Sequence, residues 1–513
     1  MNISKSIILL IFLVGFANAY TSSGNAFYCN SCEDCTAALN DNRYQIVYLE
    51  NDISLSENAR FCIPAPENFT NKVFDCQGHK IIGHGIDLDP FENSIGVAVW
   101  DEWEIVRQEK LTSKNNNTIK RCVVTEFDIG FSLDETVNDI ILTDNIAYGN
   151  EDAFSIFSSN TIITNNTAYE NFGFGFYVFS GNENTLIDNT AHGNSESGFY
   201  VDYNKNSILT NNIAYNNLQH GFYLNIDYNN INGNIAYNNQ QHGFYIEGEN
   251  NMLKENIAYD NSESGFDLNS AHTNSFINNE AYNNAESGFY FTTTDTNILT
   301  NNTVYNNKNG FFFKHIESST LTSNTALNNS EYGLYMGSYS IITTLVKNKI
   351  CNNKIDIYII ELDAPWLNWM DNSATENICD LTENWNDEGT TGCTYTCSGA
   401  GGPTTSIIDS IIDAVVSFVE GLINAILSFF TPETEETVLT SYDITSSDVE
   451  EKMDGQSPAP FDAESLDSSM EHQEPAGGLN YQNILSLNPR EKKSLFLRMK
   501  VLVFQHILIL ILV

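Results

Sequence analysis

Two histidines and a row of tyrosines recur at matching points of the sequence. His220 and His242 each stand directly before a Gly-Phe pair. Imidazole groups one strand spacing apart could share a soft metal ion, although two exposed turn histidines would give the same pattern. Rings in register on an outward face could stack on sugars, or could simply stack on each other and rigidify a sheet. The tyrosines that directly follow a Gly-Phe pair are Tyr177, Tyr200, Tyr223, Tyr245 and Tyr290.

Carboxylates and arginines, in contrast, do not form a catalytic pattern in the same stretch. Cleavage of a glycosidic bond by general acid–base catalysis needs two carboxylates at a set distance. Asp202 and Asp227 are separated by about one repeat unit but stand in dissimilar turn contexts. No Arg occurs between Arg121 and Arg490. We therefore assign no catalytic residue and expect no glycosidase or lyase activity from this stretch.

A repeat from residue 138 to residue 353 must position these side chains. Ten anchor asparagines are spaced 21 to 24 residues apart, and a second asparagine follows each of them five residues later. A fixed period of this length is typical of a solenoid, in which each unit buries its apolar face only against its neighbours. The anchors are Asn145, Asn166, Asn189, Asn212, Asn234, Asn256, Asn279, Asn302, Asn324 and Asn348.

Apolar columns around the anchors indicate the kind of solenoid. The third residue before every anchor is apolar, as at Leu209, Ile231 and Leu253. Short runs with period-two alternation, separated by Asn and Gly, favour three short strands in each coil of 22–23 residues. We therefore predict an all-β fold, a parallel β-helix. The Asn side chains are expected at tight turns with left-handed backbone, where they would hydrogen-bond along the stack.

The repeat resembles a known family. The run NTLIDNTA at 184–191, followed by SGFYV at 197–201, resembles the right-handed parallel β-helix repeat. More narrowly, it resembles the NosD-type family, often labelled periplasmic copper-binding, and the wider group of β-helices in carbohydrate-binding proteins and sugar hydrolases. The resemblance covers about residues 59–360. The resemblance implies the fold. Membership of these groups would in addition suggest a metal-handling or a glycan-directed role.

The segments before and within the first coils are assigned from composition. Residues 1–19 have an apolar run and a small-residue cleavage site, which predicts a signal peptide and export. Residues 20–58 are predicted to cap the β-helix, whose first coil is placed at 71–85. An insertion at about 87–116 holds Trp100 and Trp103, which are further candidates for carbohydrate binding. The alternative is a solvated loop.

Four segments follow the β-helix. Residues 361–400 are predicted to form a Cys- and Trp-rich C-terminal cap, and residues 401–431 an apolar helix with a polar stripe that either lies at a membrane surface or self-associates. Residues 432–489 are predicted to be an acidic disordered linker. Residues 490–513 are a basic and apolar tail, short for a membrane span but a candidate anchor. The stretches that could associate with a membrane are 407–430 and 495–513.

All ten cysteines are expected to be mainly in disulfides, because an exported chain meets an oxidising compartment. The Cys-x-x-Cys spacings near the N-terminus leave zinc as the alternative. Cys393 and Cys397 are predicted to pair with each other or with Cys351 or Cys379. The candidate disulfide cysteines are Cys29, Cys32, Cys35, Cys62, Cys76, Cys122, Cys351, Cys379, Cys393 and Cys397.

The charge of the chain limits its partners. The formal net charge is −43 and the isoelectric point is near 4.2, so nucleic acid is a poor partner. No cofactor is firmly implied, although such a charge suits high-salt surroundings or a divalent cation. We expect a secreted or cell-surface protein, either free or membrane-anchored, with a structural or binding role towards glycans or other surface proteins. The alternatives are a polysaccharide-degrading enzyme with its site at the insertion, and a NosD-like copper-handling factor.

Overall fold

The computed structural model describes residues 20–57, 59–86, 93–99, 114–337, 340, 344–360 and 373–397. All of them belong to one compact unit that ends at Ser410. The predicted signal peptide, the tryptophans Trp100 and Trp103, the predicted apolar helix and the C-terminal tail lie outside the described residues. Within the described part of the chain, no helix is long and apolar enough to span a membrane.

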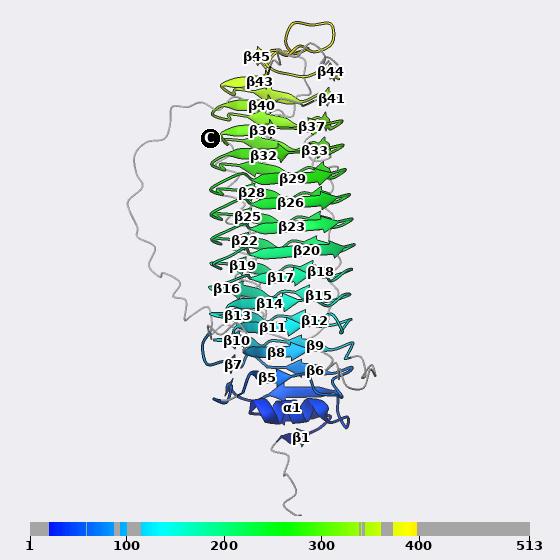
Figure 1. Ribbon diagram of the computed structural model, residues 1–513, viewed down its shortest axis with the longest axis vertical. Coiled ribbons are helices and arrows are strands. Elements are labelled where there is room, and N and C mark those ends of the chain that lie inside the picture. The colour runs from blue at the N-terminus through cyan, green and yellow to red at the C-terminus, as the bar shows by residue number, and fades with distance from the viewer. Residues whose placement is uncertain are drawn as a thin grey trace, which may run out of the picture. The chain divides into compact units, whose positions relative to one another are not determined.

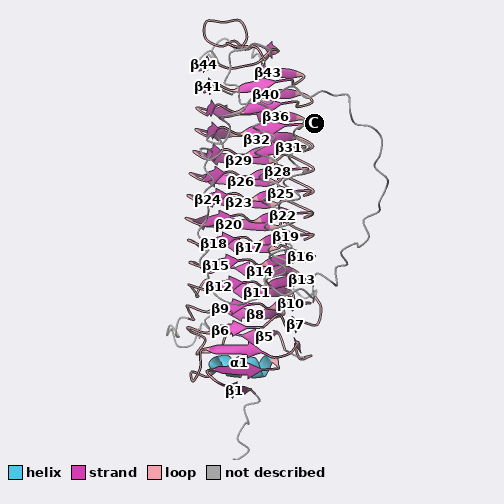
Figure 2. Cartoon of the chain, turned by 180° about the vertical axis from the view of Figure 1, so that it is seen from behind, coloured by secondary structure: helices cyan, strands magenta, loops and turns pink. Residues whose placement is uncertain are grey.

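The described unit is a stack of coils, each made of three short strands that face three different directions (Figures 1 and 2). Strands of successive coils pair in parallel, and β1 with β2 is the antiparallel pair that begins the stack. The described residues contain one helix, α1 (Cys32–Asn40), which packs at the N-terminal end. The predicted class, an all-β right-handed parallel β-helix, is confirmed.

The first sheet contains sixteen strands. In spatial order these are β1 (Thr21–Ser23), β2 (Ala26–Cys29), β3 (Ile46–Leu49), β6 (Val73–Asp75), β9 (Thr118–Lys120), β12 (Ile141–Thr143), β15 (Ile162–Thr164), β18 (Thr185–Ile187), β21 (Ile208–Thr210), β24 (Asn230–Asn232), β27 (Met252–Lys254), β30 (Ser275–Ile277), β34 (Ile298–Thr300), β38 (Thr320–Thr322), β41 (Thr344–Val346) and β44 (Ser373–Thr375).

The second sheet contains thirteen strands, none longer than three residues. They are β4 (Ile53–Ser54), β7 (Lys80–Ile82), β10 (Val123–Thr125), β13 (Ile146–Tyr148), β16 (Thr167–Tyr169), β19 (Thr190–His192), β22 (Ile213–Tyr215), β25 (Ile235–Tyr237), β28 (Ile257–Tyr259), β31 (Glu280–Tyr282), β35 (Thr303–Tyr305), β39 (Thr325–Leu327) and β42 (Lys349–Cys351).

The third sheet contains fourteen strands, and those at its middle have up to seven residues. They are β5 (Phe61–Pro64), β8 (Ile95–Val99), β11 (Ile129–Leu133), β14 (Asp152–Ile156), β17 (Phe176–Phe179), β20 (Phe199–Lys205), β23 (Phe222–Asp227), β26 (Phe244–Glu249), β29 (Phe266–His272), β32 (Ser287–Thr292), β36 (Asn309–Phe313), β40 (Tyr332–Met336), β43 (Ile355–Ile359) and β45 (Thr382–Glu383). A separate pair joins β33 (Thr294–Asp295) to β37 (Ile316–Glu317).

The core consists of identical or similar side chains stacked coil upon coil. Leu209, Ile231 and Leu253 are register partners on β21, β24 and β27 and are buried, which confirms the predicted inward column. The Phe of each Gly-Phe pair forms a second column, in which the rings of Phe222 and Phe244 stack with centroids 4.7 Å apart. Because each coil covers the apolar side chains of the one below, the stack forms one continuous core.

The anchor asparagines point into this core and form ladders. Asn212 is fully buried, and its Nδ2 donates to Oδ1 of Asn234 at 2.9 Å and to the Leu186 carbonyl at 2.9 Å. The bonding along the stack is thus as predicted. The left-handed backbone, however, belongs to the residue before each anchor, as in Asn211 with φ 54°. The prediction for the anchors themselves was wrong, because an inward side chain at the corner requires the preceding residue to make the bend.

A third asparagine-rich column was missed in the sequence. It lies five residues before the anchors, where Asn229 donates to Oδ1 of Asn251 at 3.2 Å. Each coil therefore has three corners, each with an inward polar side chain that satisfies backbone carbonyls of the coil below. Ser and Thr replace Asn at Thr161, Ser207 and Ser319, which hid the column.

A glycine is required before the inward Phe because the corner is crowded. A Cβ on Gly198 would lie 2.8 Å from Nδ2 of Asn217 and 3.0 Å from Cβ of Ala214. Both atoms belong to the tightly packed next coil, so neither could move away at low cost. The Gly-Phe pair of the repeat thus reflects a packing constraint at the entry to the third sheet.

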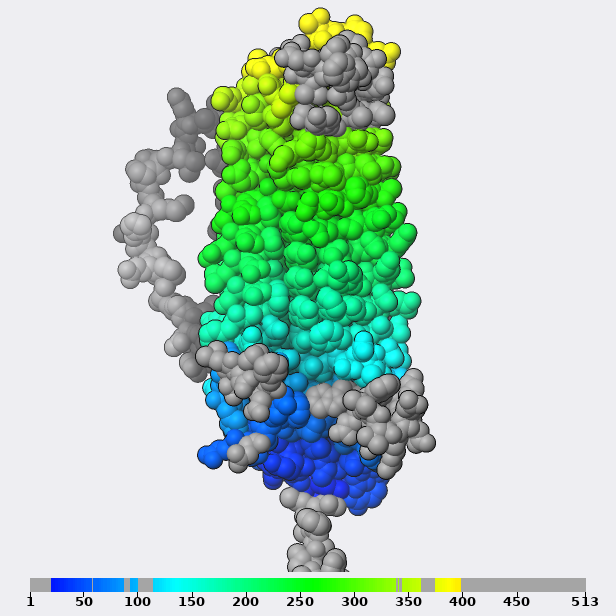
Figure 3. Space-filling view, viewed as in Figure 1, coloured from blue at the N-terminus to red at the C-terminus, as the bar shows by residue number. Residues whose placement is uncertain are grey.

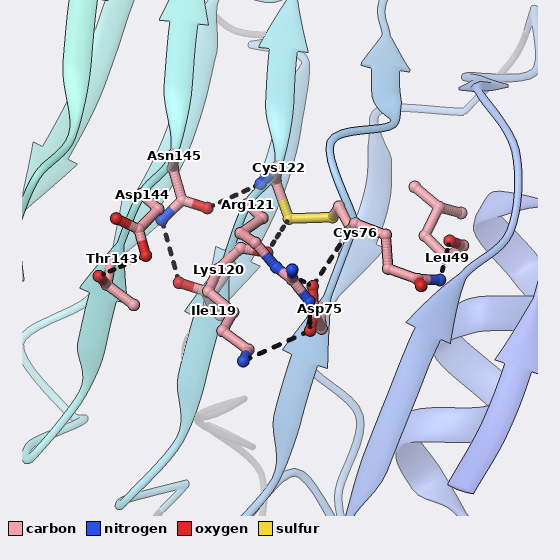
Figure 4. A network of polar contacts seen from close by, with 11 residues as sticks. Leu49, Asp75, Cys76, Ile119, Lys120, Arg121, Cys122, Thr143, Asp144 and Asn145 are labelled. Atoms are coloured by element: carbon pink, nitrogen blue, oxygen red, sulfur yellow. Dashed lines mark hydrogen bonds and ion pairs between the residues drawn. A yellow bond between two sulfur atoms is a disulfide. The ribbon is translucent and has the colours of Figure 1, made fainter. Parts of the chain in front are cut away.

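The ten cysteines form five disulfides, so the expectation of disulfide bonding is confirmed. Cys397 pairs with Cys351 and Cys393 pairs with Cys379, which is within the predicted set of partners. The Cys76–Cys122 disulfide joins two adjacent coils (Figure 4). Cys122 occupies the position of an anchor asparagine, and its N–H donates to Oδ1 of Asn145, as the N–H of an anchor does in the other coils. The remaining disulfides, which link α1 to the first strands, are Cys29–Cys35 and Cys32–Cys62.

Two predicted boundaries inside the first coils differ from the structure. The first coil consists of β3, β4 and β5, so the coil placed at 71–85 is the second one. Residues Ile95–Val99, which were predicted to belong to the insertion, are the buried strand β8 of the third sheet. The sequence around β8 was interpreted as part of a loop because it lacks the anchor Asn and the Gly-Phe pair that mark the regular coils.

Candidate functional site

The outward side of the third sheet carries a row of tyrosines. We name the outward side of β17, β20, β23, β26 and β29 the tyrosine face. Tyr200 and Tyr223 stack with centroids 4.5 Å apart, and the spacings to Tyr177 and Tyr245 are 5.3 and 5.2 Å. All four side chains are half-buried. Seen from the side shown in Figure 3, the coils that hold these strands form the green and cyan middle of the stack.

The spacing of the rings determines how a ligand could contact them. Adjacent rings are close to parallel and about 5 Å apart, which leaves no space for a sugar ring between them. The ladder therefore offers ring edges and hydroxyl groups to a ligand. Contact of this kind relies on hydrogen bonds more than on the stacking of sugars on ring faces that the sequence suggested.

A column of polar side chains runs beside the ladder from β20 to β29, two residues further along each strand, whereas on β17 this position is Phe179. Tyr200 donates from its hydroxyl to Oδ2 of Asp202 at 3.2 Å. One coil beyond Tyr223, Tyr245 donates to Oε1 of Glu247 at 2.9 Å. Burial, together with the negative charge of Asp202, raises the pKa of Tyr200 to about 12, so the hydroxyl keeps its proton.

The upper end of this column is closed by an amide. Asn269 donates from Nδ2 to the Tyr245 hydroxyl at 2.9 Å and to Oε1 of Glu247 at 3.2 Å. Asn225, on β23, is the register partner of both Asp202 and Glu247. The column thus alternates carboxylates and amides at one coil spacing, which is an arrangement suited to a chain-like ligand with regularly spaced polar groups.

Asp202 is the most unusual member of this column. Its residue is only 6 % exposed, and Oδ1 is buried without a hydrogen-bond partner among the described residues. Burial raises the pKa of this carboxyl, although the Tyr200 hydroxyl opposes the shift. A buried acceptor without a donor is unfavourable by about 1–3 kcal/mol, so the negative charge of Asp202 is poorly compensated within the chain.

The two histidines lie along the other edge of the tyrosines. The rings of His220 and His242 stack 5.3 Å apart, and His220 also stacks on Tyr245 at 5.1 Å. The alternative of two exposed turn histidines is wrong, because the side chain of His242 is 15 % exposed and burial lowers the pKa of His220 to about 4. Both rings are therefore neutral at physiological pH.

His242 has a defined tautomer. The Ser264 N–H donates to its Nδ1 at 3.1 Å, so in the neutral ring the proton is on Nε2. Nε2 lies 2.8 Å from Oε2 of Glu263 and 3.2 Å from Oδ2 of Asp267. Burial and the neighbouring His220 ring lower the pKa of His242 to about 3. Across the described residues, no group of three or more His, Cys, Asp or Glu side chains is arranged to hold a metal ion, so the metal pair stays a prediction.

Asp267 interrupts the tyrosine ladder. It occupies the register position between Tyr245 and Tyr290, and it is 7 % exposed. Burial, followed by repulsion from Glu263 and Glu247, raises its pKa to about 7. Tyr290 is thereby separated from the four lower tyrosines and stacks instead on Phe312 at 5.4 Å.

The structure thus brings together four of the five predicted tyrosines and both histidines. Trp100 and Trp103 lie outside the described residues, so their proposed role stays a prediction. Sequence reasoning missed Glu247, Asn269 and Asn225 and considered Asp202 only as a catalytic carboxylate. The signal that could have found them is their constant position two residues after the residue that follows each Gly-Phe pair, on the same side of the strand.

The chain belongs to a defined family of folds. The family model "Right handed beta helix region" matches residues 66–214, 110–241 and 204–355, which together cover more than half of the chain. The protein is therefore a member of the right-handed β-helix family. No curated protein shows significant sequence similarity to the chain.

Solved structures that are similar to the chain include two epimerases and a glucanase. The A-module of the mannuronan C-5 epimerase AlgE6 from Azotobacter vinelandii is 16 % identical, with 69 % of this chain and 96 % of that chain aligned and a TM-score of 0.48. A periplasmic alginate epimerase AlgG is 12 % identical over 71 % and 79 % of the two chains, with a TM-score of 0.37. The catalytic domain of a GH87 alpha-1,3-glucanase is 11 % identical over 71 % and 68 %, with a TM-score of 0.42. At these identities the likeness concerns the fold alone.

Proposed function

We propose that this protein is an exported β-helix that binds a glycan chain along its tyrosine face. The observation that carries the proposal is the hydrogen-bonding column of Asp202, Asn225, Glu247 and Asn269 beside an outward tyrosine ladder. Both columns continue from coil to coil, so a linear ligand lying along the stack would meet a tyrosine and a polar side chain on each of β20, β23 and β26.

The energetics of the face support binding of a polar chain. Tyrosine combines a rigid apolar ring with a hydroxyl and loses little conformational entropy on binding, because its ring is already held between neighbours. Hydrogen bonds that involve a carboxylate contribute more than neutral ones, about 1.5–3 kcal/mol each. A few repeated contacts of this kind are enough for a specific site.

Export is part of the same proposal. The apolar segment at residues 1–19 and the pairing of all ten cysteines fit an oxidising compartment. The other predicted roles, a polysaccharide-degrading site at the insertion and a copper-handling factor, depend on residues outside the described part or on a third metal ligand.

The test compares two triple variants that remove hydroxyl groups and leave the rings in place. Replacing Tyr200, Tyr223 and Tyr245 by Phe should weaken binding to the glycans that the full chain retains on an array by about tenfold or more. Titration calorimetry on the purified, folded protein would measure the dissociation constant. Melting temperature would show that the ring stacking is preserved.

The matched control lies on the second sheet. Replacing Tyr215, Tyr237 and Tyr259 by Phe removes three hydroxyls from an equally stacked ladder, with centroids 4.9 Å apart, and should leave binding unchanged. Equal loss in both variants, or no loss in the third-sheet variant, would contradict the proposal. So would the absence of any bound glycan.

A further inference from the structure

We infer that the tyrosine face binds a glycan with free, protonated amino groups, in preference to one that carries carboxylate or sulfate groups. The inference rests on the proposed function, since it names the chemical class of the glycan. It is carried by the hydrogen-bond polarity of the face, by the buried carboxylate of Asp202 and by the distribution of charge around them.

The two carboxylates of the column can only accept hydrogen bonds. The hydroxyl protons of Tyr200 and Tyr245 are directed to Asp202 and Glu247. The Nδ2 group of Asn269 is engaged by Tyr245 and Glu247. A ligand group that meets Asp202 or Glu247 must therefore donate, as hydroxyl and ammonium groups do and carboxylates do not.

The buried Asp202 selects among donors. Its Oδ1 atom is enclosed and has no partner among the described residues, although the carboxylate is on the outward side of β20. Because this atom is enclosed, a ligand would meet Asp202 mainly through its charge, and a nearby ammonium group would compensate the charge that burial leaves poorly solvated, whereas a hydroxyl group would not. Glu247 lies two strands further up in the same column, since Asn225 is the register partner of both residues. Two such positions match a ligand with repeated amino groups.

The charge of the surroundings has one sign. In β17, β20, β23, β26 and β29 the one Lys or Arg is Lys205, which is paired with Asp227 at 3.1 Å, and His272 at the end of β29 lies 3.1 Å from Asp295. The histidines beside the ladder are neutral, because burial lowers their pKa values. Glu263 and Asp267 add further carboxyl groups at the same edge. The face would attract an ammonium group and repel a uronate or a sulfate.

The experiment measures binding of three oligosaccharides of equal length to the full chain at slightly acidic pH. They are an oligomer of glucosamine, its N-acetylated counterpart and an oligomer of galacturonic acid. We expect the glucosamine oligomer to bind about tenfold or more tightly than the other two, and its binding to weaken as salt is added. The Asp202→Asn and Glu247→Gln double variant should abolish most of this preference.

The control is a carboxylate with the same local contact on the other ladder. Glu280 accepts from the Tyr305 hydroxyl at 2.8 Å, as Glu247 accepts from Tyr245 at 2.9 Å. Glu280→Gln should leave the preference intact, whereas melting temperatures report any loss of folding in either variant.

The possible results separate the inference from the proposed function. Tighter binding of the galacturonic acid oligomer, or equal binding of the free and N-acetylated oligomers, would overturn the inference. If the Phe variants of the tyrosine face still weakened such binding, the proposed function would stand. Loss of the preference in Glu280→Gln but not in the double variant would also overturn the inference. If none of the three oligosaccharides bound and the glycan array were empty, both would fall.

Discussion

The second and third sheets each carry an outward tyrosine ladder, yet the two ladders have different surroundings. On the second sheet the rings of Tyr215, Tyr237 and Tyr259 are evenly spaced at 4.9 Å and almost parallel. The other outward position of these strands is mainly Ile or Thr. In the described part of this ladder, the hydroxyl hydrogen bonds lie at its two ends, on Tyr148 and Tyr305.

The third sheet differs because its strands are longer. A three-residue strand has two outward positions, whereas β20, β23 and β26 each have room for a tyrosine and a polar residue beyond it, and a histidine precedes β23 and β26. The extra position is where Asp202 and Glu247 lie. The two ladders are thus alike in ring stacking and differ in the second outward column, on which the proposed glycan site depends. The following predictions test this difference.

The largest expected effect contrasts the two sides of one strand. Phe244→Ala should lower the free energy of unfolding by about 3–5 kcal/mol, because its ring is fully buried between two other Phe rings. Tyr245→Ala should lower it much less, since Tyr245 faces outward and is half-buried. Denaturant unfolding of both variants measures the difference. Equal losses would contradict the assignment of inward and outward columns.

A prediction of intermediate size concerns Asp267, which interrupts the tyrosine ladder of the third sheet. Asp267 has a pKa raised to about 7, above its usual value near 4 in an unfolded chain. Its ionisation therefore costs stability, and that cost grows as the pH rises from about 4 to 7. Asp267→Asn should raise the free energy of unfolding at pH values above 7 by about 1–3 kcal/mol.

The control for this prediction is pH itself. Below the unfolded pKa the wild-type carboxyl is protonated in both states, so the variant should have no advantage there. Unfolding curves recorded across this range would measure the difference. An advantage of the same size at every pH would show that Asp267 acts through packing instead of charge.

The smallest effect compares single members of the two ladders. Tyr223→Ala and Tyr237→Ala each remove a ring stacked on both sides, so both should lose about 0.5–1.5 kcal/mol of stacking beyond the buried area. Thermal melts should therefore barely distinguish them. Glycan binding should distinguish them clearly, with a loss only in Tyr223→Ala. If Tyr237→Ala lost binding and Tyr223→Ala did not, the site would be on the second sheet.

The disulfide prediction shows how far sequence spacing could reach. Cys122 lies 23 residues before Asn145, so the repeat length alone puts it in the anchor column, and in the structure its N–H donates to the Asn145 side chain. Its partner Cys76 was not predictable, because the spacing of the first coils differs from that of the others. In the structure these coils are also joined by Arg121, whose Nε donates to Oδ1 of the buried Asp75 at 2.9 Å.

For a similar reason, the sequence predicted the tyrosines of the candidate site but not their polar neighbours. The tyrosines were visible because they repeat at a fixed distance from the Gly-Phe pair. The residues that give them polar partners vary in type from coil to coil, so Asp202, Asn225 and Glu247 do not form a column in the letters of the sequence. Their common feature is geometric, since all three face outward on adjacent strands.

The sequence by itself determined the repeat, the three strands of each coil, the inward columns and the disulfide-bearing ends. It could do so because a β-helix stacks equivalent residues directly, so spacing along the chain becomes position in space. The tertiary structure decided which corner residue takes the left-handed backbone, that the histidines are half-buried and neutral, and that the third-sheet ladder has a second outward column with Asp202 and Glu247 beside it. Those features depend on contacts between coils, on solvent exclusion and on strand length, and none of these is encoded at a fixed offset within one repeat.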